Sequence, residues 1–102
     1  MKKKTKKPRV PGAAEIKAEI SKLKEIKPKV QRFSGFGGDN HAAIDAQIHV
    51  LTHNTDEDEI YDLFSGSGED QTNIRCEAIA TREWMDGLTD DRPSADWVHL
   101  VK

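Results

Sequence analysis

Three histidines and an aspartate recur at four-residue intervals in the middle of the chain, which places neighbouring side chains on one face of a helix. His49 and His53 are an i, i+4 pair whose ring nitrogens could bind one Zn²⁺. Successive steps of this kind drift by about 40° around a helix, so His41 lies about 120° from His53 and cannot reach the same ion. Only Cys76 offers a thiolate as a further ligand. We therefore expect a polar helix flank with an Asp45–His pair, and no metal or cofactor.

No set of Ser, His, Asp or Cys residues has a spacing that suggests nucleophilic catalysis, and the chain is predicted to be non-enzymatic. The glycine-rich segment 33–38 lacks the Lys-Ser/Thr pair of a phosphate-binding loop, and no predicted strand precedes it. It is expected to be a linker, whose Phe33 and Phe36 form an apolar contact for a partner. Cys76 is expected to be a buried structural residue, because Glu77 beside it disfavours a thiolate.

The formal net charge of −2 hides a division between two parts of the chain. Residues 1–32 contain twelve Lys or Arg and three Glu, a net charge of +9. Residues 33–102 contain four Lys or Arg and fifteen Asp or Glu, a net charge of −11. Such an asymmetry indicates a charged segment that meets a partner or folds onto the rest of the chain.

The basic residues begin in an arm at residues 1–11, which is predicted to be flexible and disordered. Its Lys and Arg side chains could follow a nucleic-acid backbone and release counterions. No aromatic residue interleaves them, so base stacking is not offered. A solubilising tail is the alternative. The candidate polyanion-binding residues are Lys2, Lys3, Lys4, Lys6, Lys7 and Arg9.

The acidic residues are densest just after the histidine stripe. A helical protein with this many carboxylates could imitate DNA and block a nucleic-acid-binding protein. The alternative is a solvated face whose carboxylates favour the positive end of a helix. The candidate partner-binding residues are Asp56, Glu57, Asp58, Glu59 and Asp62.

Length and composition predict one small domain over residues 12–102. No apolar run could span a membrane, and no apolar segment of a secretory signal follows the basic N-terminus. The single cysteine fits a reducing compartment, so a cytoplasmic location is expected.

Apolar residues at three- and four-residue steps predict an all-α fold, a small bundle of about four helices. Asp39 or Asn40, Asn54 and Gly87 are the expected caps. Thr55 is expected to open the third helix. Trp97 is expected to pack the C-terminal tail, an extended segment or a short turn, on the helices, or to contact a partner. The three glycines between residues 35 and 38 predict a loop without regular structure. The expected helices cover residues 12–27, 41–53, 55–64 and 70–86.

Short segments resemble a group of small proteins encoded by bacteriophages and prophages. They are residues 17–20 (KAEI), 23–28 (LKEIKP), 84–87 (WMDG) and 92–101 (RPSADWVHLV). Residues 55–72 depart from the pattern. The resemblance implies a phage origin and transfers no activity or catalytic residue. It favours a role in binding and inhibiting a host enzyme or defence complex, which would place the protein in the cytoplasm of the host cell.

Three functional hypotheses follow. The first is a small phage-type protein that binds and inhibits a host or defence protein through charged surfaces, by imitating nucleic acid. The second is a nucleic-acid-binding accessory protein that uses residues 1–32. The third is a homo-oligomer that sequesters a nucleotide between basic residues of neighbouring subunits. None of them involves a membrane.

Overall fold

The first helix follows directly from the sequence around residue 12. In the computed structural model, which describes residues 10–35, 38–64 and 72–102, helix α1 runs over Ala13–Ile26. Gly12 is its N-cap, and the backbone N–H of Gly12 donates to Glu15 Oε1 at 3.3 Å, which is the half of a capping box that glycine allows. Pro28 then forces a 3-10 turn, η1 (Lys27–Lys29), as a proline after the last α-helical residue predicts.

The glycine-rich segment departs from its expected irregular loop. Strand β1 (Ser34–Gly35) pairs antiparallel with β2 (Gly38–Asp39), and so the expectation of no regular structure there is wrong. Gly38 has φ of 113°, a conformation that glycine adopts at low cost. Arg32 donates to the Asp39 carboxylate, and Phe33 N donates to Asn40 Oδ1 at 3.0 Å. Side-chain bonds therefore join the two ends of the hairpin.

The second helix, α2 (Asn40–His53), confirms the predicted position and both predicted caps. The Asp39 carboxylate accepts from His41 N at 2.8 Å. Asn54 ends the helix in the left-handed region with φ of 51°. Both caps are local side-chain or backbone effects, which is why sequence alone finds them.

Helix α3 (Glu57–Leu63) starts one residue later than expected, because Asp56 and not Thr55 is its N-cap. Thr55 is instead 1% exposed. Helix α4 spans Thr72–Met85. Gly87, with φ of 77°, follows it as predicted, and Gly87 N donates to Trp84 O at 3.1 Å.

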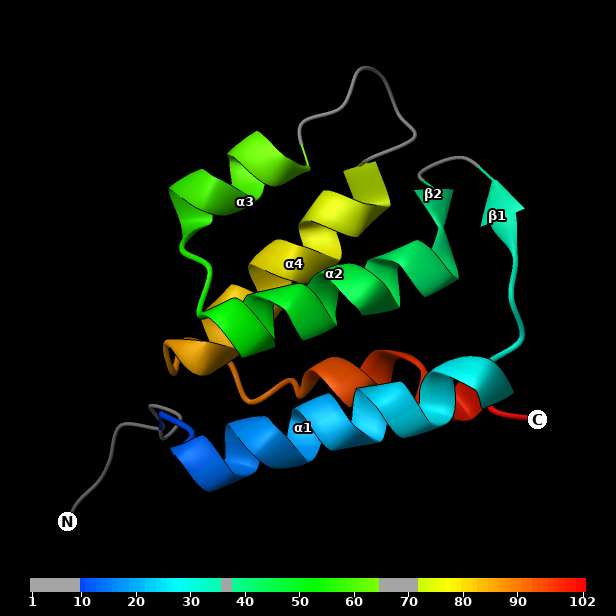
Figure 1. Cartoon of the computed structure of the whole chain (residues 1–102), viewed down its shortest axis with the longest axis horizontal. Helices are drawn as coiled ribbons and strands as arrows, with labels where there is room; N and C mark the ends of the chain where they lie inside the picture. The colour runs from blue at the N-terminus through cyan, green and yellow to red at the C-terminus, as the bar shows by residue number, and fades with distance from the viewer. Residues whose placement is uncertain (1–9, 36–37, 65–71) are drawn as a thin grey trace, which may run out of the picture.

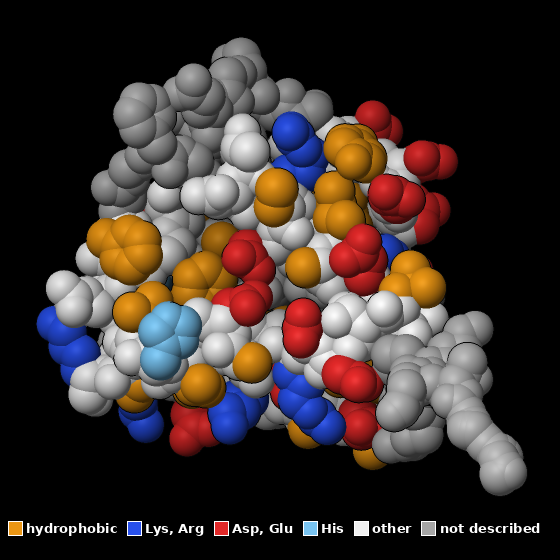
Figure 2. Space-filling view, turned by 180° about the vertical axis from the view of Figure 1, so that it is seen from behind, with side chains coloured by type: hydrophobic (Ala, Val, Ile, Leu, Met, Phe, Trp, Pro, Cys, Tyr) orange, Lys and Arg blue, Asp and Glu red, His pale blue; other side chains and the backbone are white. Residues whose placement is uncertain are grey.

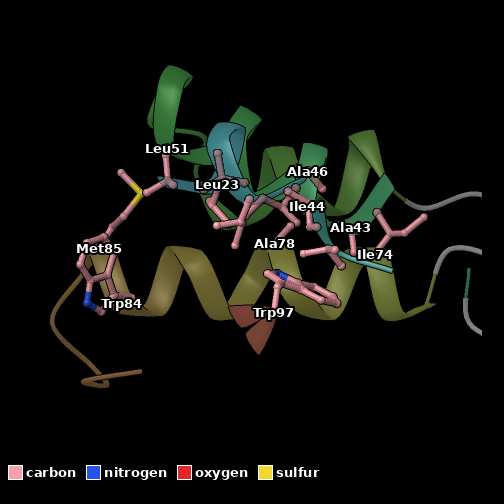
Figure 3. Close-up of a cluster of buried hydrophobic side chains, with 14 residues drawn as sticks. Leu23, Ala43, Ile44, Ala46, Leu51, Ile74, Ala78, Trp84, Met85 and Trp97 are labelled. Atoms are coloured by element: carbon pink, nitrogen blue, oxygen red, sulfur yellow. The ribbon is translucent and has the colours of Figure 1, made fainter. Parts of the chain in front are cut away.

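Helices α2 and α4 form the central pair of the fold, with α1 packed on α2 and α3 on α4 (Figure 1). Leu23, Ile44, Val50 and Ile60, one or two from each of three helices, are fully buried. Figure 3 shows Trp84 beside Met85 at one end of α4 and Trp97 nearer the middle of the core. The prediction of a mostly helical chain is confirmed, and both tryptophans belong to the core at 5% and 7% exposure.

The C-terminal segment, residues 93–101, docks through short turns, one of the two forms that the sequence predicts, and not as an extended tail. It forms two 3-10 helices, η3 (Pro93–Asp96) and η4 (Val98–Leu100), with Trp97 between them. An antiparallel bridge joins Val101 to Val30 beyond α1. Since η3 contacts both α1 and α4, this segment completes the core between them. Within the described residues, no helix has the length and apolar character needed to cross a membrane.

Candidate functional site

The acidic residues singled out in the sequence lie together on α3, and we call Asp56, Glu57, Asp58, Glu59 and Asp62 the acidic patch. Asp56 caps the helix by accepting from Glu59 N at 2.9 Å. Three further carboxylates occupy the first turn, where the partial positive charge of the helix favours them. All five residues are exposed, and α3 contains no basic residue. The patch is therefore uniformly negative.

A hollow of about 440 Å³ lies between this end of α3 and the end of α4, and we call it the acidic hollow. Carboxylates from both helices line it. In Figure 2 acidic side chains gather at the upper right, where α3 lies, and continue across the middle of the face. The lining residues are Asn54, Asp56, Glu57, Ile79, Arg82, Glu83, Asp86 and Leu88.

Arg82 is the single cation among these lining residues, and its guanidinium is already engaged. It forms an ion pair with Asp86 at 2.8 Å and donates to Asn54 Oδ1 at 2.8 Å and to Thr55 O at 3.0 Å. These bonds tie the end of α4 to the start of α3. Glu57 and Glu83 remain exposed, as does Leu88 at 66%. The hollow therefore offers carboxylates and the apolar side chains of Ile79 and Leu88 to a partner.

Several of the basic side chains that the structure describes lie on α1, which Figure 1 places across α2 from α3, while Arg75 and Arg82 lie on α4. Lys17, Lys22 and Lys24 are exposed. Lys27 is instead bonded to Asp45 at 2.7 Å. The predicted polyanion-binding residues of the arm, Lys2 to Arg9, lie outside the described residues. The exposed lysines of α1 thus lie away from the acidic patch of α3, although Glu25 on α1 and Arg82 on α4 add charges of the other sign to each side.

Two of the three residues of the proposed apolar contact, Phe33 and Trp97, line one hollow of about 270 Å³. Phe33 is 54% exposed beside the hairpin, and Phe36 lies outside the described residues. Trp97 is buried, and its Nε1 donates to Gln47 Oε1 at 2.7 Å. Its ring therefore serves the core in the folded chain.

The histidine stripe is divided among separate contacts. His41 Nε2 lies 3.0 Å from Val30 O, and Asp45 pairs with Lys27 in place of the expected histidine. The rings of His49 and His53 lie with centroids 4.5 Å apart. Over residues 10–35, 38–64 and 72–102, no three His, Cys, Asp or Glu side chains are grouped to hold a metal ion.

Sequence reasoning missed two buried acceptors. Glu19 is 3% exposed; its Oε1 accepts from Ser94 N at 3.1 Å and its Oε2 from Arg92 Nη1 at 3.4 Å. Gln47 is fully buried between α4 and the C-terminal segment. Both residues continue the apolar stripe of their helices, three positions after Ile16 and Ile44. The sequence signal for these buried acceptors was a polar residue at a position of the apolar stripe that faces the core.

The expectation for Cys76 is wrong, because the residue is exposed. It lies on the side of α4 that turns toward η3, where it lines a second hollow with its neighbour Glu77. Burial, and then the neighbouring Asp96, raise the pKa of the Glu77 carboxyl to about 8.

Among the described residues, no basic side chain lines this second hollow or a third one, of about 270 Å³, that Glu77 also lines. The carboxyl group with this raised pKa thus lies away from the acidic hollow, at the contact with the C-terminal segment. In comparisons with protein families, curated proteins and solved structures, nothing matches this chain.

Proposed function

We propose that this chain is a non-enzymatic binding protein of the bacteriophage type that inhibits a host or defence protein in the cytoplasm. It docks the acidic patch and the acidic hollow on a basic, nucleic-acid-binding surface of that protein. The observation that carries the proposal is the hollow itself. It joins carboxylates of α3 and α4 around a guanidinium that is already paired.

Fixed carboxylates suit this role because arginine and lysine side chains that bind phosphates also bind carboxylates. Asp56 is held by its cap bond to Glu59 N, and Asp86 by Arg82. The spacing of these charges is therefore set before binding, which lowers the ordering cost of the complex. Exposed Leu88 adds apolar area at the rim. Free duplex DNA, by contrast, is repelled by this face.

The test captures partners from host lysate on the immobilised protein, before and after nuclease treatment, and over a range of salt. Charges of this kind are screened beyond about 8 Å at physiological ionic strength, so capture should weaken steeply as salt rises. Each captured protein is purified and tested for DNA binding with and without the chain. We expect the chain to displace DNA from its partner.

Two double variants, each of which removes two exposed carboxylates, locate the interface. The double variant Glu57→Gln with Glu83→Gln removes two exposed carboxylates of the acidic hollow and should abolish displacement of DNA. The control, Glu25→Gln with Asp45→Asn, removes two exposed carboxylates on the α1 side and should retain it. Displacement that survives the first variant and ignores salt would refute the proposal.

A second candidate function is nucleic-acid binding through residues 1–32. The exposed lysines of α1 favour it, since Lys17, Lys22 and Lys24 project into solvent, where a phosphate could reach them. This function predicts that the chain binds labelled DNA or RNA directly. The slope of the logarithm of the binding constant against the logarithm of the salt concentration should fall by about one unit for each phosphate contact removed. Substituting these three lysines by glutamine separates the two candidates, because displacement of DNA from a protein partner should be unaffected.

A further inference from the structure

The C-terminal segment is attached to the helix pair through a small polar cluster inside an apolar contact. Fully buried Gln47 on α2 is its centre. Its Oε1 accepts from Trp97 Nε1 at 2.7 Å, and its Nε2 lies 3.3 Å from Glu77 Oε1 and 3.5 Å from Asp96 Oδ2. The side-chain amide of Gln47 on α2 thus contacts Glu77 on α4 and both Asp96 and Trp97 in the C-terminal segment.

Two carboxyl groups therefore share a single neighbour, because Gln47 Nε2 brings the side chains of Glu77 and Asp96 together. Two carboxylates that lie this close repel each other, which favours the state in which one of them keeps its proton. Burial of Glu77, and then the charge and hydrogen bond of Asp96, raise the pKa of Glu77 from its ordinary 4.5 to about 8. The proton is thus part of the contact at neutral pH.

The charged groups around the pair do not compensate a second negative charge. From the loop after α4, Asp91 lines the hollow of about 290 Å³ on one side, together with the thiol of Cys76. From β2, Asp39 lines the hollow of about 270 Å³ on the other side, and its carboxylate is bonded to Arg32. No titratable side chain of α2 or α1 and no Lys or Arg lines either hollow, within the described residues.

We propose that Glu77 and Asp96 form a proton-linked latch that holds the C-terminal segment on α4. With one proton shared, the latch is closed. When both groups are ionised, their repulsion loosens η3 from α4, the bond from Trp97 to Gln47 is lost and the indole becomes accessible. The contacts of Glu19 with Ser94 and of Val101 with Val30 do not involve the latch, so the loosened segment stays tethered to α1.

The size of the effect follows from linkage. A carboxyl that titrates near pH 8 and not at 4.5 holds its proton roughly a thousandfold more tightly in the closed state. Loss of the proton shifts the equilibrium from the closed to the open latch by the same factor at most. The reason is linkage: the closed state favours the proton by as much as the proton favours the closed state. Solvent in the two hollows lowers this factor, since Glu77 is only half-buried.

The test follows the two indoles separately by ¹⁹F NMR of protein labelled with 5-fluorotryptophan. Each tryptophan gives one resonance, and Trp97→Phe assigns them. We expect the Trp97 resonance to shift between pH 6 and 9.5 with a midpoint near 8, while the Trp84 resonance stays constant. Over the same range an added paramagnetic quencher should broaden the Trp97 resonance increasingly.

Glu77→Gln is the decisive variant, because an amide cannot ionise and still donates a hydrogen bond to Asp96. It should abolish the transition and keep Trp97 protected at pH 9.5. Glu83→Gln, an exposed change on the same helix, should leave the transition intact. A Trp97 resonance that is flat in the unmodified protein, or that shifts equally in Glu77→Gln, overturns the proposal.

A second measurement keeps the proposal testable if Glu77→Gln folds poorly. The raised pKa of Glu77 in the folded state means that the folded chain binds one proton more than the unfolded chain between pH 4.5 and about 8. The free energy of unfolding should therefore fall as pH rises through that window. Asp96→Asn, which removes the repelling charge, should reduce this fall without abolishing it, because burial of Glu77 is the larger cause of its raised pKa. An equal fall in Asp96→Asn overturns the latch.

Discussion

Replacing Glu19 tests whether one buried carboxylate holds the C-terminal segment against α1. Glu19→Ala leaves Ser94 N, in a residue that is 4% exposed, without an acceptor. An unsatisfied buried N–H costs about 1–3 kcal/mol. The ion pair with Arg92, whose side chain is 50% exposed, adds roughly 0–1 kcal/mol. We expect the free energy of unfolding to fall by about 2–3 kcal/mol.

The assay is urea unfolding followed by far-UV circular dichroism, with thermal melts beside it. A loss of this size corresponds to a midpoint lowered by roughly 8–20 °C for a chain of this length. Glu19→Gln keeps an oxygen for Ser94 N and should lose only about 1 kcal/mol.

Glu25→Ala is the matched control, because it makes the same substitution in the same helix at a side chain that is 70% exposed. It should change the free energy of unfolding by no more than about 0.5 kcal/mol. The reasoning fails if Glu19→Ala and Glu25→Ala unfold at the same urea concentration.

Two further substitutions test the core and a cap. Trp97→Phe keeps a ring in place but leaves the buried Gln47 Oε1 without a donor, so urea unfolding should show a loss of about 1–3 kcal/mol; adding Gln47→Leu should recover part of it, and no recovery would contradict the role of the bond. Gly87→Ala places a side chain at φ of 77° and should cost about 1–2 kcal/mol, and an unchanged melting temperature would show that the turn relaxes without strain.

The positions and caps of the helices could be predicted from the sequence because the signals for them are local. Asp39 caps α2 through a bond to a residue two positions away, and Asn54 and Gly87 have positive φ values, which their residue types adopt at low cost. The acidic patch was accessible for the same reason, since its residues are nearly consecutive on α3. The acidic hollow was not, because Glu83 and Asp86 come from α4.

The polar cluster shows why the remaining features escaped prediction. Gln47 contacts Glu77 and Trp97, which are 30 and 50 positions further along the chain. Nothing in the spacing of these residues distinguishes them from solvated polar side chains. The hairpin of β1 and β2 likewise depends on bonds across seven residues, from Arg32 to Asp39, that outweigh the weak strand propensity of glycine.

The position of the C-terminal segment also has a consequence for synthesis. Helix α1 packs its apolar stripe on α2 and on η3, and the bond from Ser94 to Glu19 spans 75 positions. At a translation rate of about 5–20 residues per second, α1 waits roughly 4–15 s for that partner to be made. During this interval its buried residues, Leu23 and Ile26, have only part of their final cover. Nascent chains of this protein should therefore depend on chaperones that bind exposed apolar helices until residue 101 has emerged from the ribosome.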